Sequence, residues 1–337
     1  MKKISAVISL ILCAVLMFAS CAPTATQETT TKAAEATTAA AKEEIRIGLL
    51  KGPTGMGAAY LLENNSLEKT KAKYDVTLAS AVDVLKASLI NSELDIAALP
   101  TNVAAVLNGK TQGKIQILAV NTLGVIYLMS NTQDIAEVKD LKGKTILSAG
   151  QGTTTEYVLN YILEKNGLVP GEDVTVEFAS EHAEVITKAK AGDYSVVLLP
   201  EPFVTQMKAQ DSSFNTVIDL TKAWENAGGS LLTMGCVAVR SDFAAENPTA
   251  VAYFLADYKE SVDYVNANTA DAAALIEKFE IAKAAVAEKA LPNCNITFMA
   301  GEEMKKNVSA YLNILAELNA QAVGGALPSD SFYYIAK

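Results

Sequence analysis

Short apolar runs and amphipathic segments alternate along most of the chain. Apolar stretches at residues 45–50, 74–79 and 95–99 have the length of buried strands, and each precedes a segment with apolar residues at helical spacing. The connecting loops are short, which is typical of βαβ units around a mainly parallel sheet. The pattern therefore predicts the α/β class.

The same pattern occurs twice with one spacing. Gly52 lies in a loop 48 positions before Pro100, and Gly152 lies in a loop 48 positions before Pro200; each proline ends an apolar run. We expect two similar α/β lobes joined by two chain crossings that form a hinge. The predicted boundaries are 43–124 and 232–337 for lobe 1 and 125–231 for lobe 2.

Helical spacing dominates after Asn247. Asn247-Pro248 is a helix start signal, because proline favours the first helical turn. Further helices are expected over 269–280, 281–290 and 301–319, with no strand among them. These C-terminal helices are predicted to pack on the first lobe.

The N-terminus has a separate pattern. Two lysines precede the apolar run 4–18, which is too short to span a bilayer and fits a secretory signal. Ala19-Ser20-Cys21 follows and is similar to a bacterial lipobox. Residues 1–20 are therefore predicted to be a lipoprotein signal peptide and Cys21 the lipidation site; an ordinary secretory signal with an incidental cysteine is the alternative.

Residues 21–42 consist almost entirely of Ala, Thr, Glu, Lys and Gln. Such a segment buries too little apolar surface to fold, and it is predicted to be a disordered tether with a span of roughly 25 Å. Lipid, tether and folded body together predict a protein anchored at the extracytoplasmic face of the bacterial cell membrane.

Charge and cysteine content limit the classes of ligand and partner that we expect. The formal charge is −10, with only two arginines, Arg46 and Arg240, so nucleic acid is not an expected partner. Beyond the N-terminal region only Cys236 and Cys294 are left. They either form one disulfide or stay as buried free thiols, and no cysteine spacing suggests a metal site.

Candidate ligand-binding residues follow from the position of the predicted loops. In open α/β sheets, ligands bind beyond the carboxyl ends of strands, where helix N-termini present free N–H groups. Four such ends, two in each predicted lobe, carry small or polar residues. The candidates are Lys51, Gly52, Thr54, Gly55, Thr101 and Asn102 in lobe 1 and Gln151, Gly152, Thr153, Thr154 and Glu201 in lobe 2.

Each candidate also has a structural alternative. Threonines cap helices in any protein, glycines serve tight turns, and a glutamate in a first helical turn gains roughly 0.3–1 kcal/mol from the helix dipole. Lys51 is the only cation in these loops, and a solvated surface lysine is its alternative. His182 is the single histidine and is expected to be structural.

Several of these segments carry a family resemblance. The Gly-Pro-Thr-Gly loop at 52–55 and the runs 95–100 and 197–203 resemble type II periplasmic binding proteins, closest to the nitrate/sulfonate/thiamine-precursor group. The resemblance covers Glu43 to the C-terminus. It implies a monomer without cofactor whose cleft closes on a small-molecule solute and delivers it to an ABC permease in the membrane.

Enzyme functions find little support in the sequence. There is no Ser/His/Asp set, P-loop or metal-spaced cluster, so no catalytic or metal-binding residue is predicted. Two enzyme groups resemble this fold, but thiamine-pyrimidine synthases carry a cysteine-rich motif that the chain lacks, and menaquinone-pathway dehydratases are cytoplasmic. A solute-sensing lipoprotein without a transport role is a further alternative.

The sequence leaves the solute open. An oxyanion would bind through helix N-termini and Lys51, and a pyrimidine or other amine would bind through Glu201 and an aromatic ring. The lack of an arginine in the candidate loops disfavours amino acids and dicarboxylates, which commonly use a bidentate clamp.

Overall fold

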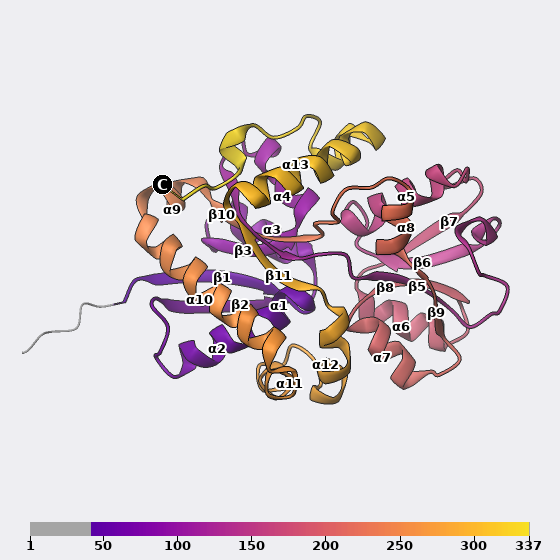
Figure 1. The fold of residues 1–337 in the computed structure, drawn as a ribbon, viewed down its shortest axis with the longest axis horizontal. Helices are drawn as coiled ribbons and strands as arrows, with labels where there is room; N and C mark the ends of the chain where they lie inside the picture. The colour runs from indigo at the N-terminus through magenta and orange to yellow at the C-terminus, as the bar shows by residue number, and fades with distance from the viewer. Residues whose placement is uncertain (1–41, 337) are drawn as a thin grey trace, which may run out of the picture. The chain divides into compact units, whose positions relative to one another are not determined.

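The computed structural model describes residues 42–336, and its strands form two sheets (Figure 1). We call the six-stranded sheet with its helices the first lobe. Its strand order is β11-β4-β10-β3-β1-β2. The strands are β1 (Glu44–Leu50), β2 (Lys73–Ala79), β3 (Ile96–Pro100), β4 (Ile115–Thr122), β10 (Gly235–Arg240) and β11 (Ile296–Ala300).

The five-stranded sheet with its helices is the second lobe. Its strand order is β7-β6-β8-β5-β9, which repeats the order of five strands in the first sheet. The strands are β5 (Ile126–Ser130), β6 (Thr145–Ala149), β7 (Thr175–Ala179), β8 (Val196–Pro200) and β9 (Asn215–Asp219). The α/β class with two similar lobes is thereby confirmed.

Helices cover both sheets. The helices that follow strands in the first half are α1 (Pro53–Gly57), α2 (Ala59–Ser66), α3 (Val82–Ile90), α4 (Thr101–Lys110), α5 (Thr154–Lys165), α6 (His182–Lys190), α7 (Phe203–Gln210) and α8 (Leu220–Asn226). The later helices are α9 (Ser241–Glu246), α10 (Pro248–Ala267), α11 (Thr269–Lys278), α12 (Ala284–Ala290) and α13 (Gly301–Leu318). Short 3₁₀ turns are η1 (Val138–Leu141), η2 (Leu291–Asn293), η3 (Ala320–Val323) and η4 (Asp330–Phe332).

Each sheet is mixed rather than parallel throughout. In the first sheet β10 runs antiparallel to β3 and β4, and in the second β5 runs antiparallel to β8 and β9. Both strands are entered directly from the other lobe, so no helical crossover within the sheet sets them parallel to their neighbours. The chain leaves the first sheet after Thr122, enters the second at Ile126, and returns between Asn226 and Gly235.

The C-terminal segment differs from its prediction in two ways. It contains a strand, β11, which pairs antiparallel with β4 at the edge of the first sheet. Its helices pack mainly on the first lobe, as predicted, yet α12 also contacts α7 and α13 also contacts α5 of the second lobe. The tail therefore touches both lobes.

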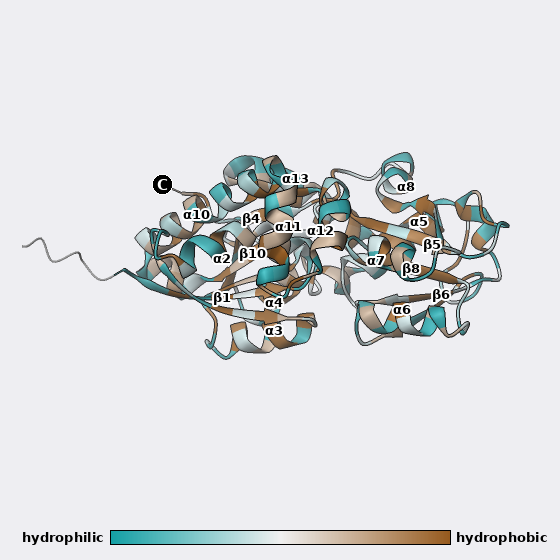
Figure 2. Cartoon of the chain, turned by 90° about the horizontal axis from the view of Figure 1, so that it is seen from below, coloured by the Kyte–Doolittle hydropathy of each residue, from teal (hydrophilic) through white to brown (hydrophobic). Residues whose placement is uncertain are grey.

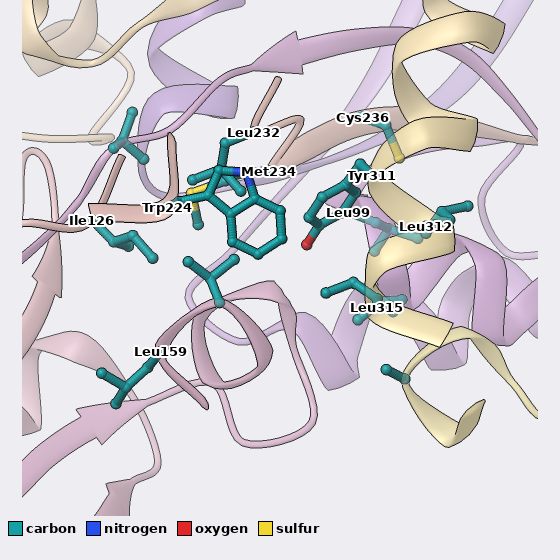
Figure 3. Close-up of a cluster of buried hydrophobic side chains, with 14 of the residues drawn as sticks. Leu99, Ile126, Leu159, Trp224, Leu232, Met234, Cys236, Tyr311, Leu312 and Leu315 are labelled. Carbon is teal, nitrogen blue, oxygen red and sulfur yellow. The ribbon is translucent and has the colours of Figure 1, made fainter. Parts of the chain in front are cut away.

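One apolar cluster joins the lobes. Trp224 of α8 is fully buried, and its ring centroid lies 4.5 Å from that of Tyr161 of α5 and 5.8 Å from that of Tyr311 of α13. Figure 3 shows Trp224 beside Tyr311 in this cluster. The α13 side chains enter this cluster at helical spacing, with Tyr311, Leu312 and Leu315 fully buried. In Figure 2 the strands β5 and β8 are largely brown, as expected for strands covered on both faces.

The N-terminal predictions lie outside the described residues. This holds for the signal peptide, for Cys21 and for the tether up to residue 41. Lys42 is described, and its Nζ donates to the carbonyl oxygens of Glu68 and Thr70. Between residues 42 and 336 no helix combines the length and apolar character needed to cross a membrane.

Candidate functional site

The carboxyl ends of β3 and β6 meet across the lobe boundary. Asn102, in the first turn of α4, donates from Nδ2 to the carbonyl oxygen of Gly152 at 3.1 Å. Its Oδ1 accepts from Thr154 Oγ1, also at 3.1 Å. Three candidate residues from different lobes are thus in direct contact, and the lobes are closed on one another.

A cavity of about 510 Å³ lies on the side of this contact formed by α7, α11 and α12. From the first lobe, Lys51 and Gly52 line it; from the second lobe, Pro202, Phe203 and Gln206 line it. It is therefore an opening between lobes that holds two of the candidate residues.

A second cavity of about 530 Å³ is lined by the first turns of α3 and α6 and by the β6–α5 loop. It contains the candidates Gln151, Gly152 and Thr153. Gly150 and Gly152 have φ values of +82° and +71°, so the loop needs glycine at both positions. The candidate residues are thus divided between two cavities and the closed contact between them.

The other candidates are buried. Gly55 is required by packing, since a Cβ there would lie 2.5 Å from the carbonyl oxygen of Leu50. Thr54 Oγ1 donates to the same carbonyl at 3.3 Å. Thr101 and Glu201 are 0% and 4% exposed. The structure therefore gives Thr54 and Gly55 a local structural role.

The capping alternative applies to Glu201 but not to the threonines. Thr153 is the N-cap of α5, yet its Oγ1 donates to the carbonyl of Gly150 and accepts no cap bond. Thr101 Oγ1 is buried without a hydrogen-bond partner among the described residues. Glu201, in contrast, accepts at 3.1 Å from both the amide and the hydroxyl of Thr205 in the first turn of α7.

Glu201 is buried and forms no ion pair with any of the described residues. Burial raises the pKa of its carboxyl, while the bonds from Thr205 and the charge of Lys208 act in the opposite direction. Burial likewise raises the pKa of Tyr127 to about 12, with the charges of Asp219 and Glu201 contributing, and raises the pKa of the Cys294 thiol, with the charge of Glu201 contributing. Both groups are therefore uncharged at neutral pH.

Polar residues at the two crossings were not among the candidates. Asn121 Oδ1, Thr122 Oγ1 and Thr233 Oγ1 are buried and have no hydrogen-bond partner within the described part of the chain. Gly235 lies between the first two, because a Cβ there would be 2.7 Å from Asn121 Oδ1 and 3.2 Å from Thr122 Oγ1. Their sequence signal is a polar residue at the end of an otherwise apolar run.

The two cysteines beyond the N-terminal region do not form a disulfide. Cys236 and Cys294 are free and buried. His182 packs against Phe203, with ring centroids 5.0 Å apart, and burial lowers its pKa to about 4. Over residues 42–336 no group of acidic, histidine or cysteine side chains is arranged to hold a metal ion.

Solved structures share this arrangement of two lobes. An ABC transporter protein from Parabacteroides distasonis is 25% identical, with a TM-score of 0.72 over 87% of this chain and 99% of that one. The alkanesulfonate-binding protein SsuA from Xanthomonas axonopodis, bound to MOPS, is 17% identical with a TM-score of 0.69 over 86% and 96%. The periplasmic nitrate-binding protein NrtA from Synechocystis is 14% identical with a TM-score of 0.62 over 83% of both chains. The last two likenesses concern the fold alone.

The sequence itself matches a family model. No match was found among curated protein sequences. Residues 62–291, about two thirds of the chain, match the model described as "ABC transporter, phosphonate, periplasmic substrate-binding protein". The chain therefore belongs to this family of periplasmic substrate-binding proteins of ABC transporters.

Proposed function

We propose that this protein is a lipid-anchored, extracytoplasmic binding protein that captures a small solute between its lobes and delivers it to an ABC permease. It has no catalytic role in this proposal and acts as a monomer. The first lobe comprises residues 43–124 and 232–337, and the second comprises residues 125–231. Lipid on Cys21 keeps the body near its membrane partner.

The contact between Asn102, Gly152 and Thr154 carries the proposal. These polar groups satisfy one another across the lobe boundary in the closed arrangement. When the lobes part, the same groups face the opening, so a solute with matching polar groups replaces their mutual bonds. The proposed site also includes the candidates Lys51, Gly52, Thr101, Gln151, Thr153 and Glu201.

The binding site is tested with paired variants. A thermal-shift screen of the full chain identifies a stabilising solute, because a ligand at 100 times Kd adds about 2.7 kcal/mol of stability. Asn102→Ala and Thr154→Ala should each weaken its binding several-fold by calorimetry, since each removes a hydrogen bond worth about 0.5–1.5 kcal/mol. Exposed Asn215→Ala and Thr175→Ala serve as matched controls. Unchanged affinity in both site variants would exclude the site between the lobes.

The anchor is tested separately. Cys21→Ala should abolish incorporation of labelled fatty acid and move the protein from the membrane fraction to the soluble fraction. Cys236→Ala is the control, because that thiol is buried in the first sheet. Unchanged detergent partitioning of Cys21→Ala would contradict lipid anchoring and leave the solute site unaffected.

A further inference from the structure

The solute class follows from how the described groups around the lobe boundary are already used. We infer that the solute presents N–H donors to Glu201, as an amine or amidine does, and that it is not an oxyanion. This inference rests on the proposed binding function. It departs from the phosphonate named by the family model.

The carboxylate of Glu201 can accept further hydrogen bonds. It is 4% exposed and forms no ion pair with any residue from 42 to 336. A carboxylate offers about four lone-pair sites, and the amide and hydroxyl of Thr205 use only two of them. The charge of Lys208 favours the ionised form of Glu201, but Lys208 forms no ion pair with it among residues 42–336, so the buried carboxylate has no directly bonded positive partner there.

Asn121 provides a second acceptor. Tyr258 Oη donates its single proton to the carbonyl of Thr54, so it accepts the bond from Asn121 Nδ2. This fixes the orientation of the amide, and Asn121 Oδ1 is the end that faces Gly235 without a partner. Asn121 and Glu201 lie at the same crossing, because the Glu201 amide donates to the carbonyl of Val125.

Three backbone amides that an oxyanion could use are already bonded. The amide of Gly152, at the start of α5, donates to the carboxylate of Glu156. The amide of Thr205 in α7 donates to Glu201, and the amide of Ser180 before α6 donates to Glu184. These three backbone amides therefore already donate to the protein's own carboxylates.

The arginines are also unavailable. Arg46 and Arg240 both pair with Asp95, which directly precedes β3. This places them at the amino ends of the parallel strands, the opposite edge from the candidate loops. Lys51 is the one cationic candidate, and it lines the first cavity, whose lining does not include Glu201.

The first test needs no ligand. Since burial raises the pKa of Glu201, its ionised form destabilises the fold, and this penalty is present above the carboxyl pKa and absent in acid. Glu201→Gln should therefore raise the unfolding temperature at pH 8 and change it less at pH 4. Exposed Glu172→Gln is the control. A Glu201→Gln variant that is less stable than wild type at pH 8 would show that the carboxylate is compensated and would overturn the inference.

The second test uses matched probes on the full chain. 2-Aminopyridine at millimolar concentration should raise the unfolding temperature, whereas 2-methylpyridine, methylphosphonate and methanesulfonate should not. Glu201→Gln should remove the effect of the amine, and the exposed control Glu172→Gln should retain it. If an oxyanion stabilises the protein, or if no amine does, the assigned class is wrong. If an oxyanion binds and Asn102→Ala weakens its binding but Glu201→Gln does not, the solute class is wrong and the proposed function stands. If a probe stabilises the protein and neither variant changes its effect, the proposed binding site between the lobes is wrong.

Discussion

The two lobes share one strand plan but carry different chemistry at equivalent positions. In the first sheet β1 pairs with β3 through Ile47 and Ile96, and in the second β6 pairs with β8 through Ile146 and Val196. Each third strand ends in a proline that a helix follows. After Pro100 come a hydroxyl and an amide, whereas after Pro200 comes a carboxylate.

This difference shows which features the fold requires and which it leaves free. The strand order and the proline recur because they set up the sheet and the start of the next helix. The side chains just beyond the proline do not recur, because they face the lobe boundary rather than a core. The first lobe supplies neutral groups there, Thr101 and Asn102, and the second supplies a buried carboxylate, Glu201.

A second difference lies in what holds each lobe. In the first lobe, Asp95 forms ion pairs with Arg46 and Arg240 at the edge of the sheet where the parallel strands begin. The second lobe has Ser195 before β8 and no arginine. It gains instead the buried Trp224, against which α13 of the C-terminal tail packs.

The largest expected effect is that of Trp224→Ala. Removing a fully buried tryptophan typically costs about 3–5 kcal/mol, and here it also removes the contact with Tyr311 of α13. Denaturant unfolding should show this loss as a lower midpoint. Leu85→Ala, in the core of the first lobe, is the comparison and should not alter the contact between lobes. A decrease in the free energy of unfolding of less than about 1 kcal/mol would show that packing of Trp224 against α13 does not stabilise the second lobe.

Asp95→Asn should have the next largest effect. Asp95 accepts from the Arg46 amide and guanidinium, and bonds to charged groups contribute about 1.5–3 kcal/mol each. Loss of the charge also leaves two arginines without their carboxylate. The free energy of unfolding should fall by roughly 3 kcal/mol. Ser195→Ala, at the matching position of the second lobe, should change the free energy of unfolding by less than about 0.5 kcal/mol. Equal losses in the two variants would show that the ion pairs of Asp95 do not set the first lobe apart from the second.

Most of the sheet plan was predictable, and the two missed strands show why the rest was not. β3 and β8 are apolar throughout because helices cover both faces, so a short apolar run identifies them. β9 and β11 lie at sheet edges, and only one or two of their five residues are buried. So few apolar positions give no detectable alternation of apolar and polar residues. The sequence therefore did not predict β9 or β11.

The candidate loops were located correctly at strand ends, but their contacts were not foreseeable. Whether Asn102 meets Thr154 depends on how far the lobes close, which no local pattern encodes. Glu156 follows Gly152 by four positions, and only the fold shows that its carboxylate takes the Gly152 amide. Asn121 could have been flagged from the sequence, since an amide ending an apolar run has to find a partner or a ligand.

Asn102→Ala should shift the balance between closed and open lobes with little effect on either core. It removes the bonds to Gly152 and Thr154 across the boundary, each worth about 0.5–1.5 kcal/mol. The single tryptophan, Trp224, lies at the contact between α8 and α13 and reports the change by fluorescence. Small-angle scattering should show an expanded particle, and Asn215→Ala should not. Identical scattering for both variants would mean that these bonds do not hold the lobes closed.

The smallest effect is expected at the two thiols, which belong to the first lobe alone among residues 42–336. Burial raises the pKa of Cys236 to about 12 and also raises that of Cys294, so the reactive thiolate is scarce at pH 8 and both should label slowly. Cys294 precedes Asn295, whose Nδ2 donates to the carbonyl of Gly124 at the chain crossing, so parting of the lobes should expose it. Cys236 lies within the sheet, paired between β3 and β4. In Asn102→Ala, alkylation read by peptide mass spectrometry should therefore accelerate several-fold at Cys294 and stay unchanged at Cys236. Equal acceleration at both cysteines would indicate general loosening of the first lobe instead of hinge opening.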